Sequence, residues 1–333
     1  DNERARQGGG AGGEEGASEG RAEVTPAIRA KAQELTTGLT TDEAKARALY
    51  RHVATNVRYV AVAMGLGRIQ PNPADAVMAS GFGDCKDKHV LLEALLRAVG
   101  IESTPALIGP GTDVDSDVPS ISPFSHVMTF IETGLPTPVW LDTTMEVAPF
   151  GFLIATERDA KVLTIPFSGV SRLITTPVEA TRANSWRTET DGTLSAEGHL
   201  RATVREEVTG DLEVLLRSVF RSTGRQNWTQ IAQRLTLPRL RGGTVTNVVV
   251  SPPEDTEGPF RIDYSYSRDA FVDWKEGILY PPVAIDTSGL QIGTDGADPF
   301  ELGPVGEFVS VSRLRLPDDV EVRRESSSSL AID

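Results

Sequence analysis

The sequence contains one cysteine, four histidines and no long apolar run among its 333 residues. A single cysteine cannot form an intramolecular disulfide, so disulfides do not hold this fold together, and the redox compartment cannot be inferred from them. No segment approaches the roughly 18 apolar residues that a membrane-spanning helix needs, and no signal-peptide pattern opens the chain. We therefore expect neither a disulfide-stapled small domain nor a transmembrane segment.

Positive charge is also scarce. Lysine and arginine number 33 against 47 aspartates and glutamates, which gives a formal net charge of −14 at pH 7. This balance opposes non-specific attraction to nucleic acid or anionic lipid, so we expect no nucleic-acid partner. The length favours two cores rather than one. Because the chain begins with Asp1 and not Met, we expect a processed or excised piece, either a monomer or part of a larger multidomain chain.

The first part of the chain changes from a glycine-rich segment to helices and then to strands. Residues 1–20 hold five glycines within six positions and are predicted to be a disordered linker. Helical spacing predicts two helices after residue 24, the second capped by Thr41 or Asp42, then a short helix and a longer apolar one ending at Gly100. Strand patterns follow at STPALI, SHVMTFI, PVWLD and KVLTI. Helices followed by a sheet indicate an α+β domain over residues 21–167.

The residue pattern of the remainder predicts a mainly β domain at residues 168–325 and a frayed tail at 326–333. Residues 184–208 are predicted to form a hairpin with Asp191 and Gly192 at its turn. The segments TVTNVVVS, FRIDYSYSR and FVSVSRLRLP alternate polar and apolar residues. One long helix around residues 211–235 is predicted to interrupt these strands as a helical insertion.

The single cysteine lies where the apolar helix begins. Asp84 is the predicted N-cap, Cys85 the first helical residue, and Asp87 completes a capping box. The helix dipole there favours a thiolate, and the backbone N–H of Cys85 is one of the free donors that can hold an oxyanion. A lone cysteine is more often a small buried hydrophobe, so this position alone does not establish a nucleophile.

A cysteine nucleophile needs a base, and the sequence offers His52, His89, His126 and His199. His89 lies one helical turn after Cys85 and points sideways from it, so a structural role is favoured. Cys85 and His89 could instead supply two ligands to a metal. The further ligands that zinc requires are not grouped nearby, so we expect no metal and no cofactor.

His126 and Asp142 are brought together by the predicted hairpin. In an antiparallel pair centred near residue 134 or 135 they lie almost opposite each other, so a carboxylate would face the imidazole. A histidine in an apolar strand is by default a satisfied core residue, and only this pairing favours a base. In such a site the thiolate attacks, the imidazole shuttles the proton and the acid fixes its tautomer. Tyr59 and Gln70 are further candidates for contacts with the substrate or the oxyanion.

The run GDCKDKHVLLEALLRAVGI, the histidine that opens a strand and the later WLDTT together resemble the bacterial transglutaminase-like superfamily of papain-fold thiol enzymes. The segment ARALYRHVATNVRYVAVAMGLGRIQPNPADAV is similar to the one that these proteins place before the cysteine. The resemblance covers residues 26 to about 165. The β-rich remainder is similar to the region that follows this core in members where it lies between two β domains.

The resemblance implies a papain-like catalytic domain at residues 21–167, with Cys85 as nucleophile, His126 as base and Asp142 as the orienting acid. It also implies thiol-dependent acyl transfer, or peptide or isopeptide hydrolysis, on a protein or peptide substrate, and a location in the bacterial periplasm or cell envelope. Two departures, Ser125 where the family often has Asn and Thr143 where it often has Pro, motivate an alternative. The domain would then be an inactive scaffold or a module of the envelope that binds peptides or proteins.

Overall fold

A computed structural model describes residues 20–61, 70–112, 114–115, 120, 122–166, 169–237, 239–240, 242–276, 279–283 and 306–321. The linker predicted at residues 1–20, apart from Gly20, and the predicted tail at 326–333 lie outside the described residues. The chain divides into two compact units. The first comprises Asp1–Asn184, Thr209–Ser222 and Pro252–Phe260, and the second Ser185–Val208, Thr223–Ser251 and Arg261–Asp333. The domain bounds expected from the sequence stay a prediction.

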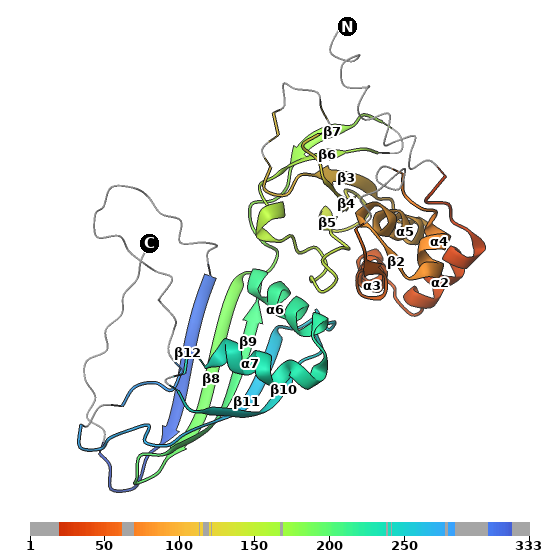
Figure 1. The fold of residues 1–333 in the computed structure, drawn as a ribbon. Coiled ribbons are helices and arrows are strands. Elements are labelled where there is room, and N and C mark those ends of the chain that lie inside the picture. Colours follow the sequence, from red (N-terminus) through yellow and green to blue (C-terminus); the bar gives the residue numbers. More distant parts are fainter. Residues whose placement is uncertain are drawn as a thin grey trace. The chain divides into compact units, whose positions relative to one another are not determined.

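Four helices gather on one side of the sheet of the first unit (Figure 1). Thr25 and Thr41 cap the first two of them, each accepting a backbone N–H of the first turn, so of the two expected caps the second helix uses Thr41. A left-handed Gly81, with φ of 69°, ends the third. The helices are α2 (Pro26–Thr36), α3 (Asp42–Asn56), α4 (Ala74–Ser80) and α5 (Cys85–Ala98).

The sheet of the first unit has the order β5-β4-β3-β6-β7, and neighbouring strands are antiparallel. The first four strands in chain order are those predicted from the sequence, so the mixed α+β class is confirmed. A separate parallel pair, β1 (Arg58–Tyr59) with β2 (Phe82–Gly83), leads into α5. The sheet strands are β3 (Thr104–Ile108), β4 (His126–Ile131), β5 (Val139–Leu141), β6 (Lys161–Thr164) and β7 (Arg172–Thr175).

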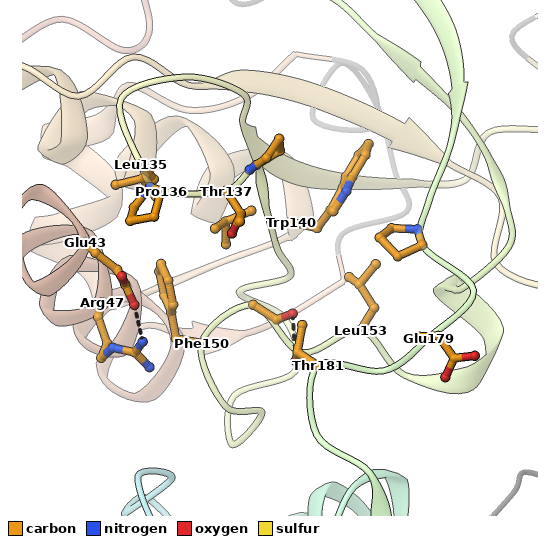
Figure 2. A pocket seen from close by; sticks show the side chains of 14 residues that line it. Glu43, Arg47, Leu135, Pro136, Thr137, Trp140, Phe150, Leu153, Glu179 and Thr181 are labelled. Carbon is orange, nitrogen blue, oxygen red and sulfur yellow. Dashed lines mark hydrogen bonds and ion pairs between the residues drawn. The ribbon is translucent and has the colours of Figure 1, made fainter.

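A pocket of about 220 Å³ opens beside β5 and α3 (Figure 2). Proline and aromatic side chains form much of its wall, including Pro136, Trp140 and Phe150. The Glu43–Arg47 ion pair, 2.7 Å long, lies at one side of it. Cys85, His126 and Asp142 are not among its lining residues, so this pocket is not where the predicted site lies.

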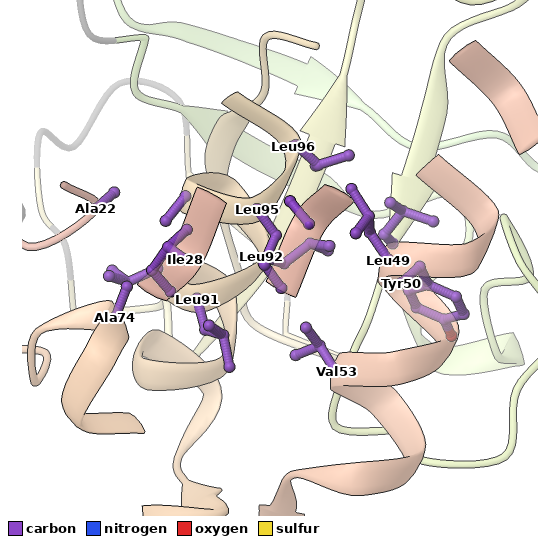
Figure 3. Close-up of a cluster of buried hydrophobic side chains, with 14 of the residues drawn as sticks. Ala22, Ile28, Leu49, Tyr50, Val53, Ala74, Leu91, Leu92, Leu95 and Leu96 are labelled. Atoms are coloured by element: carbon purple, nitrogen blue, oxygen red, sulfur yellow. The ribbon is translucent and has the colours of Figure 1, made fainter. Parts of the chain in front are cut away.

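Helix α5 is the centre of the larger core of the first unit (Figure 3). Leu91, Leu92, Leu95 and Leu96 are all inaccessible to solvent and share this core with Ile28 of α2 and Leu49 of α3. The sequence predicted burial on most sides of this helix, and that is what the structure has. Each such leucine contributes on the order of 2 kcal/mol of transfer free energy, so the helix that begins at Cys85 is held rigidly from several directions.

A second five-stranded sheet has the order β10-β11-β9-β8-β12, and nearly all residues of its strands belong to the second unit. Alternate residues of β9 are buried and exposed, the pattern of a strand with one face on a core. The strands are β8 (Asn184–Leu194), β9 (Leu200–Thr209), β10 (Thr244–Val250), β11 (Phe260–Arg268) and β12 (Gly306–Arg315), and helix α7 (Trp228–Thr236) belongs to the same unit.

Two expectations for this part of the chain are wrong. Strand β8 runs straight through Asp191 and Gly192, and the chain reverses at residues 195–198, where the N–H of Gly198 donates to the carbonyl of Ser195 at 3.0 Å. Gly198 has φ of 81°, and a Cβ there would meet the Val272 carbonyl oxygen at 2.0 Å, so this glycine and not Gly192 supplies the turn.

The predicted long helix is also interrupted. It is two helices, α6 (Asp211–Ser222) and α7, joined by the 3₁₀ turn η3 (Arg225–Asn227). The break falls in a Ser-Thr-Gly run of poor helix formers. Helix α6 belongs to the first unit. Among the described residues, none of the helices is both long enough and apolar enough to cross a bilayer.

Candidate active site

The start of α5 is built as the sequence predicted. The Asp84 carboxylate accepts the backbone N–H groups of Lys86 at 3.0 Å and Asp87 at 3.2 Å, and the Asp87 carboxylate accepts the N–H of Asp84 at 3.3 Å. The ammonium of Lys86 also pairs with Asp84. Cys85 is partly exposed as the first residue of the helix. A complete capping box therefore fixes the backbone that carries the thiol.

Asp87 has a second task that the sequence did not indicate. Its carboxylate also accepts the backbone N–H of Asn72 at 2.7 Å and the Asn72 side-chain amide at 3.2 Å. Gly83 makes this packing possible, because a Cβ at Gly83 would lie 2.6 Å from Cβ of Asp87. One carboxylate thus accepts hydrogen bonds both from the segment before α4 and from Asp84, the residue before Cys85.

His126 and Asp142 meet across the β4–β5 pair. The register joins Thr129 to Leu141 and Ile131 to Val139, so the hairpin is centred at residue 135, and Asp142 lies diagonally across from His126. Nε2 of His126 is 3.1 Å from Oδ2 of Asp142, with the two side chains 14% and 1% exposed. The structure brings the imidazole and the carboxylate into direct contact.

The imidazole is also next to the thiol. Burial lowers the pKa of His126, but hydrogen bonds to Asp142 and to Cys85, together with the charges of both groups, outweigh burial and raise this pKa to about 10. The imidazole therefore keeps its proton at neutral pH whenever both partners are charged. His126 thus contacts Asp142 and interacts electrostatically with Cys85, while the roles expected for these three residues stay a prediction.

Asp142 is held on its other side by the residue two positions further on. Thr144 donates its backbone N–H at 2.8 Å and its hydroxyl at 2.7 Å to Oδ1 of Asp142. Burial raises the pKa of Asp142, but the hydrogen bond and charge of His126, followed by hydrogen bonds from Glu157 and Thr144, outweigh it and hold this pKa well below its usual range. Asp142 is thus a carboxylate under all ordinary conditions.

Glu157 is the residue at this site that the sequence did not reveal. It ends the 3₁₀ turn η2 (Ala155–Glu157), is 1% exposed and lies beside Asp142. The segment IATERD reads as an ordinary polar loop, so no sequence signal marks a buried glutamate there. One ligand atom each from His126, Asp142 and Glu157 lies within 4.8 Å of the others. Such a group could hold a cation: His126 Nε2 and Asp142 Oδ2 lie 3.1 Å apart in it, and among the described residues no hydrogen-bond donor meets this buried oxygen in good geometry.

Tyr59 and Gln70 differ in their relation to this site. Tyr59 is 39% exposed on β1, and its N–H donates to Glu146 at 2.7 Å. Burial, followed by the charge of Cys85, raises the pKa of the Tyr59 hydroxyl. Gln70 is exposed, and among the described residues no hydrogen bond joins it to Cys85.

Two buried basic residues of α5 support the site from behind. His89 meets the hydroxyl of Thr129 in β4 through Nδ1 at 2.7 Å. The Lys88 ammonium donates to the carbonyls of Ala54 at 3.2 Å and Val57 at 2.5 Å at the end of α3. Burial lowers the pKa of Lys88 to about 8. These contacts fix α5 against β4 on one side and against the segment that leads to Tyr59 on the other.

Comparisons with known proteins give one family and one solved structure. Residues 29–107 match the family model described as the transglutaminase-like superfamily. A crystal structure of a "putative protease" from Parabacteroides distasonis aligns with 77% of this chain at 14% identity and a TM-score of 0.43. The chain spans about half of that structure, 52% of its length. No curated protein matches the chain. The region from α2 to β3, which carries Cys85, is similar to the transglutaminase-like superfamily, so the resemblance seen in the sequence is confirmed there.

Proposed function

We propose that the first unit is a thiol enzyme with a papain-like arrangement, which transfers or hydrolyses acyl groups through a thioester on Cys85. The observation that carries this proposal is the position of His126, which contacts Asp142 at 3.1 Å and interacts electrostatically with Cys85. A match to the transglutaminase-like superfamily over the segment that holds the cysteine supports it. The substrate is an amide: a glutamine side chain, or a peptide or isopeptide bond of a protein.

Acylation begins from a thiolate of Cys85 paired with the imidazolium of His126. The sulfur attacks the amide carbonyl carbon, a C–S bond forms, and the π electrons move onto the oxygen. The backbone N–H of Cys85, at the start of α5, is placed to donate to that oxyanion, aided by the helix dipole. The C–N bond then breaks, and His126 gives its proton to the departing amine, which leaves a thioester and a neutral imidazole.

Deacylation reverses the proton transfer. His126 takes a proton from an incoming amine or water, whose nitrogen or oxygen attacks the thioester carbonyl. The C–S bond breaks, the product leaves, and the thiolate and imidazolium pair is restored. Asp142 does not change its protonation in this cycle. It accepts from Nε2 of His126 and so holds the ring with its other nitrogen toward the sulfur.

The decisive experiment is the alkylation of Cys85 by iodoacetamide between pH 5 and 9, in the wild-type protein, in His126→Ala and in Asp142→Asn. We expect fast alkylation of the wild type at pH 6 and a loss of about tenfold or more in His126→Ala, because the thiolate loses its cationic partner. Cys85→Ala reports background reaction. Equal rates at pH 6 in the wild type and His126→Ala would refute the ion pair and leave the scaffold or binding role.

Turnover is then measured with a glutamine-containing peptide and a fluorescent primary amine, with ammonia release as a common readout. Incorporation of the amine indicates transfer, and ammonia without incorporation indicates hydrolysis. Cys85→Ala is expected to abolish either signal while the melting temperature stays within a few degrees of the wild type, since Cys85 lies at the surface end of its helix. Peptide cleavage in the same mixture, followed by mass spectrometry, detects the protease alternative.

A further inference from the structure

The turn that carries Glu157 is fixed from two sides within the first unit. The hydroxyl of Thr176, which follows β7, donates to the Glu157 carbonyl at 2.7 Å. Asp211, the first residue of α6, accepts the N–H of Ala155 at 3.0 Å and pairs with Arg158 at 2.7 Å. A three-residue turn held at both ends by buried or half-buried groups is not an ordinary surface loop, although its sequence is polar.

Within this turn the Glu157 side chain is 1% exposed, and one of its carboxyl oxygens lies within 4.8 Å of an oxygen of Asp142. Its Oε2 accepts one backbone N–H, that of Ile154 at 3.2 Å. The basic neighbour Arg158 is engaged by Asp211 and so does not neutralise Glu157. Asp142, in contrast, receives two donors from Thr144 and faces the imidazole of His126. Of the two carboxyl groups, Asp142 therefore has the more hydrogen-bond donors to stabilise a negative charge.

Two carboxyl groups this close together in the protein interior are not both charged at neutral pH, because burial and their mutual repulsion each favour keeping one proton. One proton has to stay with the pair. The donors around Asp142 assign the negative charge to it and the proton to Glu157. Burial, followed by the charge and hydrogen bond of Asp142, raises the pKa of Glu157 accordingly. Glu157 is thus a hydrogen-bond donor at neutral pH.

We propose that Glu157 is a positioning residue of this site, a neutral carboxylic acid that donates a hydrogen bond to Asp142 and holds that carboxylate toward Nε2 of His126. The inference rests on the proposed function and extends the triad by one member behind the acid. Asp142 then accepts hydrogen bonds from Thr144 on Oδ1 and from Glu157 as a further donor. It cannot turn away from the imidazole without breaking both.

This arrangement differs from a passive buried acid in one testable respect. A positioning role requires a donor at this place and does not require a titratable group. Glu157→Gln keeps the length and supplies an amide N–H, whereas Glu157→Met keeps the length and removes the donor. Glu157→Asp keeps the acid and shortens the reach by one methylene. A purely structural role would rank the three by volume, which places Met close to the wild type.

The experiment measures iodoacetamide alkylation of Cys85 at pH 6 in the wild type and in these three variants, with the exposed Glu179→Met as a control. Glu157→Gln is expected within about twofold of the wild type, because it restores the donor. Glu157→Met and Glu157→Asp are expected to lose about tenfold, the effect of removing one hydrogen bond to a charged group. Melting temperatures recorded alongside show which variants are folded.

Alkylation of Glu157→Met at the wild-type rate would overturn the inference, as would equal losses in Glu157→Gln and Glu157→Asp. Should Glu157→Met fail to fold, the comparison of Glu157→Gln with Glu157→Asp decides by itself. The triad is tested separately by His126→Ala. If that variant is impaired while folded Glu157→Met is not, only the role of Glu157 fails. If His126→Ala reacts like the wild type, the proposed function fails first.

Discussion

Replacing Lys88 by methionine tests whether the buried ammonium of Lys88 is charged, and by how much its burial lowers the free energy of unfolding. Lys88 is fully buried, and burial lowers its pKa from 10.5 to about 8. At about 1.4 kcal/mol per unit, this drop corresponds to about 3 kcal/mol of desolvation at neutral pH. Methionine removes that cost but leaves the carbonyls of Ala54 and Val57 without their donor, at about 1–3 kcal/mol each. The two effects nearly cancel at pH 7, with Lys88→Met the slightly less stable protein.

The pH dependence separates the two effects. A depressed pKa in the folded state means that the contribution of Lys88 to stability is complete above pH 10.5 and is lost as the pH falls through 8. Between pH 8 and 10.5 the wild type should therefore gain about 3 kcal/mol relative to Lys88→Met. Urea unfolding at several pH values measures this difference, with the exposed Lys161→Met as a control. Parallel stability curves for the wild type and Lys88→Met would refute a charged, desolvated Lys88.

Two further substitutions probe the packing of the first unit. Gly83→Ala would place its Cβ 2.6 Å from that of Asp87, so we expect alkylation of Cys85 to slow several-fold. In the control Gly258→Ala the new Cβ meets nothing within 4 Å, and we expect an unchanged alkylation rate. Equal rates in the two variants would show that the capping box tolerates the displacement. Arg217→Met removes a fully buried guanidinium that contacts Glu213 at 2.9 Å, and we expect a loss of about 3–5 kcal/mol in urea unfolding. A loss below about 1 kcal/mol would show that this ion pair is not needed.

The parts of the site that the sequence predicted are those set by local rules. The capping box around Cys85 follows from two aspartates at fixed spacing, and the meeting of His126 and Asp142 follows from the symmetry of one short hairpin. Both are determined within about twenty residues of chain. The apolar stripes of α5 likewise predicted its burial, because a helix that is apolar on most faces has to be surrounded.

Charged residues inside the fold could not be found in this way. Lys88 and Glu157 have partners that are distant in sequence or lie in irregular turns, and hydropathy assigns a charge to the surface by default. Asp191 and Gly192 show the opposite error. Their turn propensity is real but weak, and the sheet overrides it, since Gly192 packs close to Ala202 and Leu314. Tertiary contacts decide such positions.

The His89–Thr129 hydrogen bond has a consequence for how this site can vary. It joins α5 and β4 one helical turn beyond Cys85 and three residues beyond His126. This hydrogen bond between α5 and β4 therefore helps to fix the spacing between the Cys85 thiol and the His126 imidazole, independently of the covalent connection that runs from β3 to β4. We therefore expect substitutions in the connection between β3 and β4 to leave the spacing between the Cys85 thiol and the His126 imidazole unchanged.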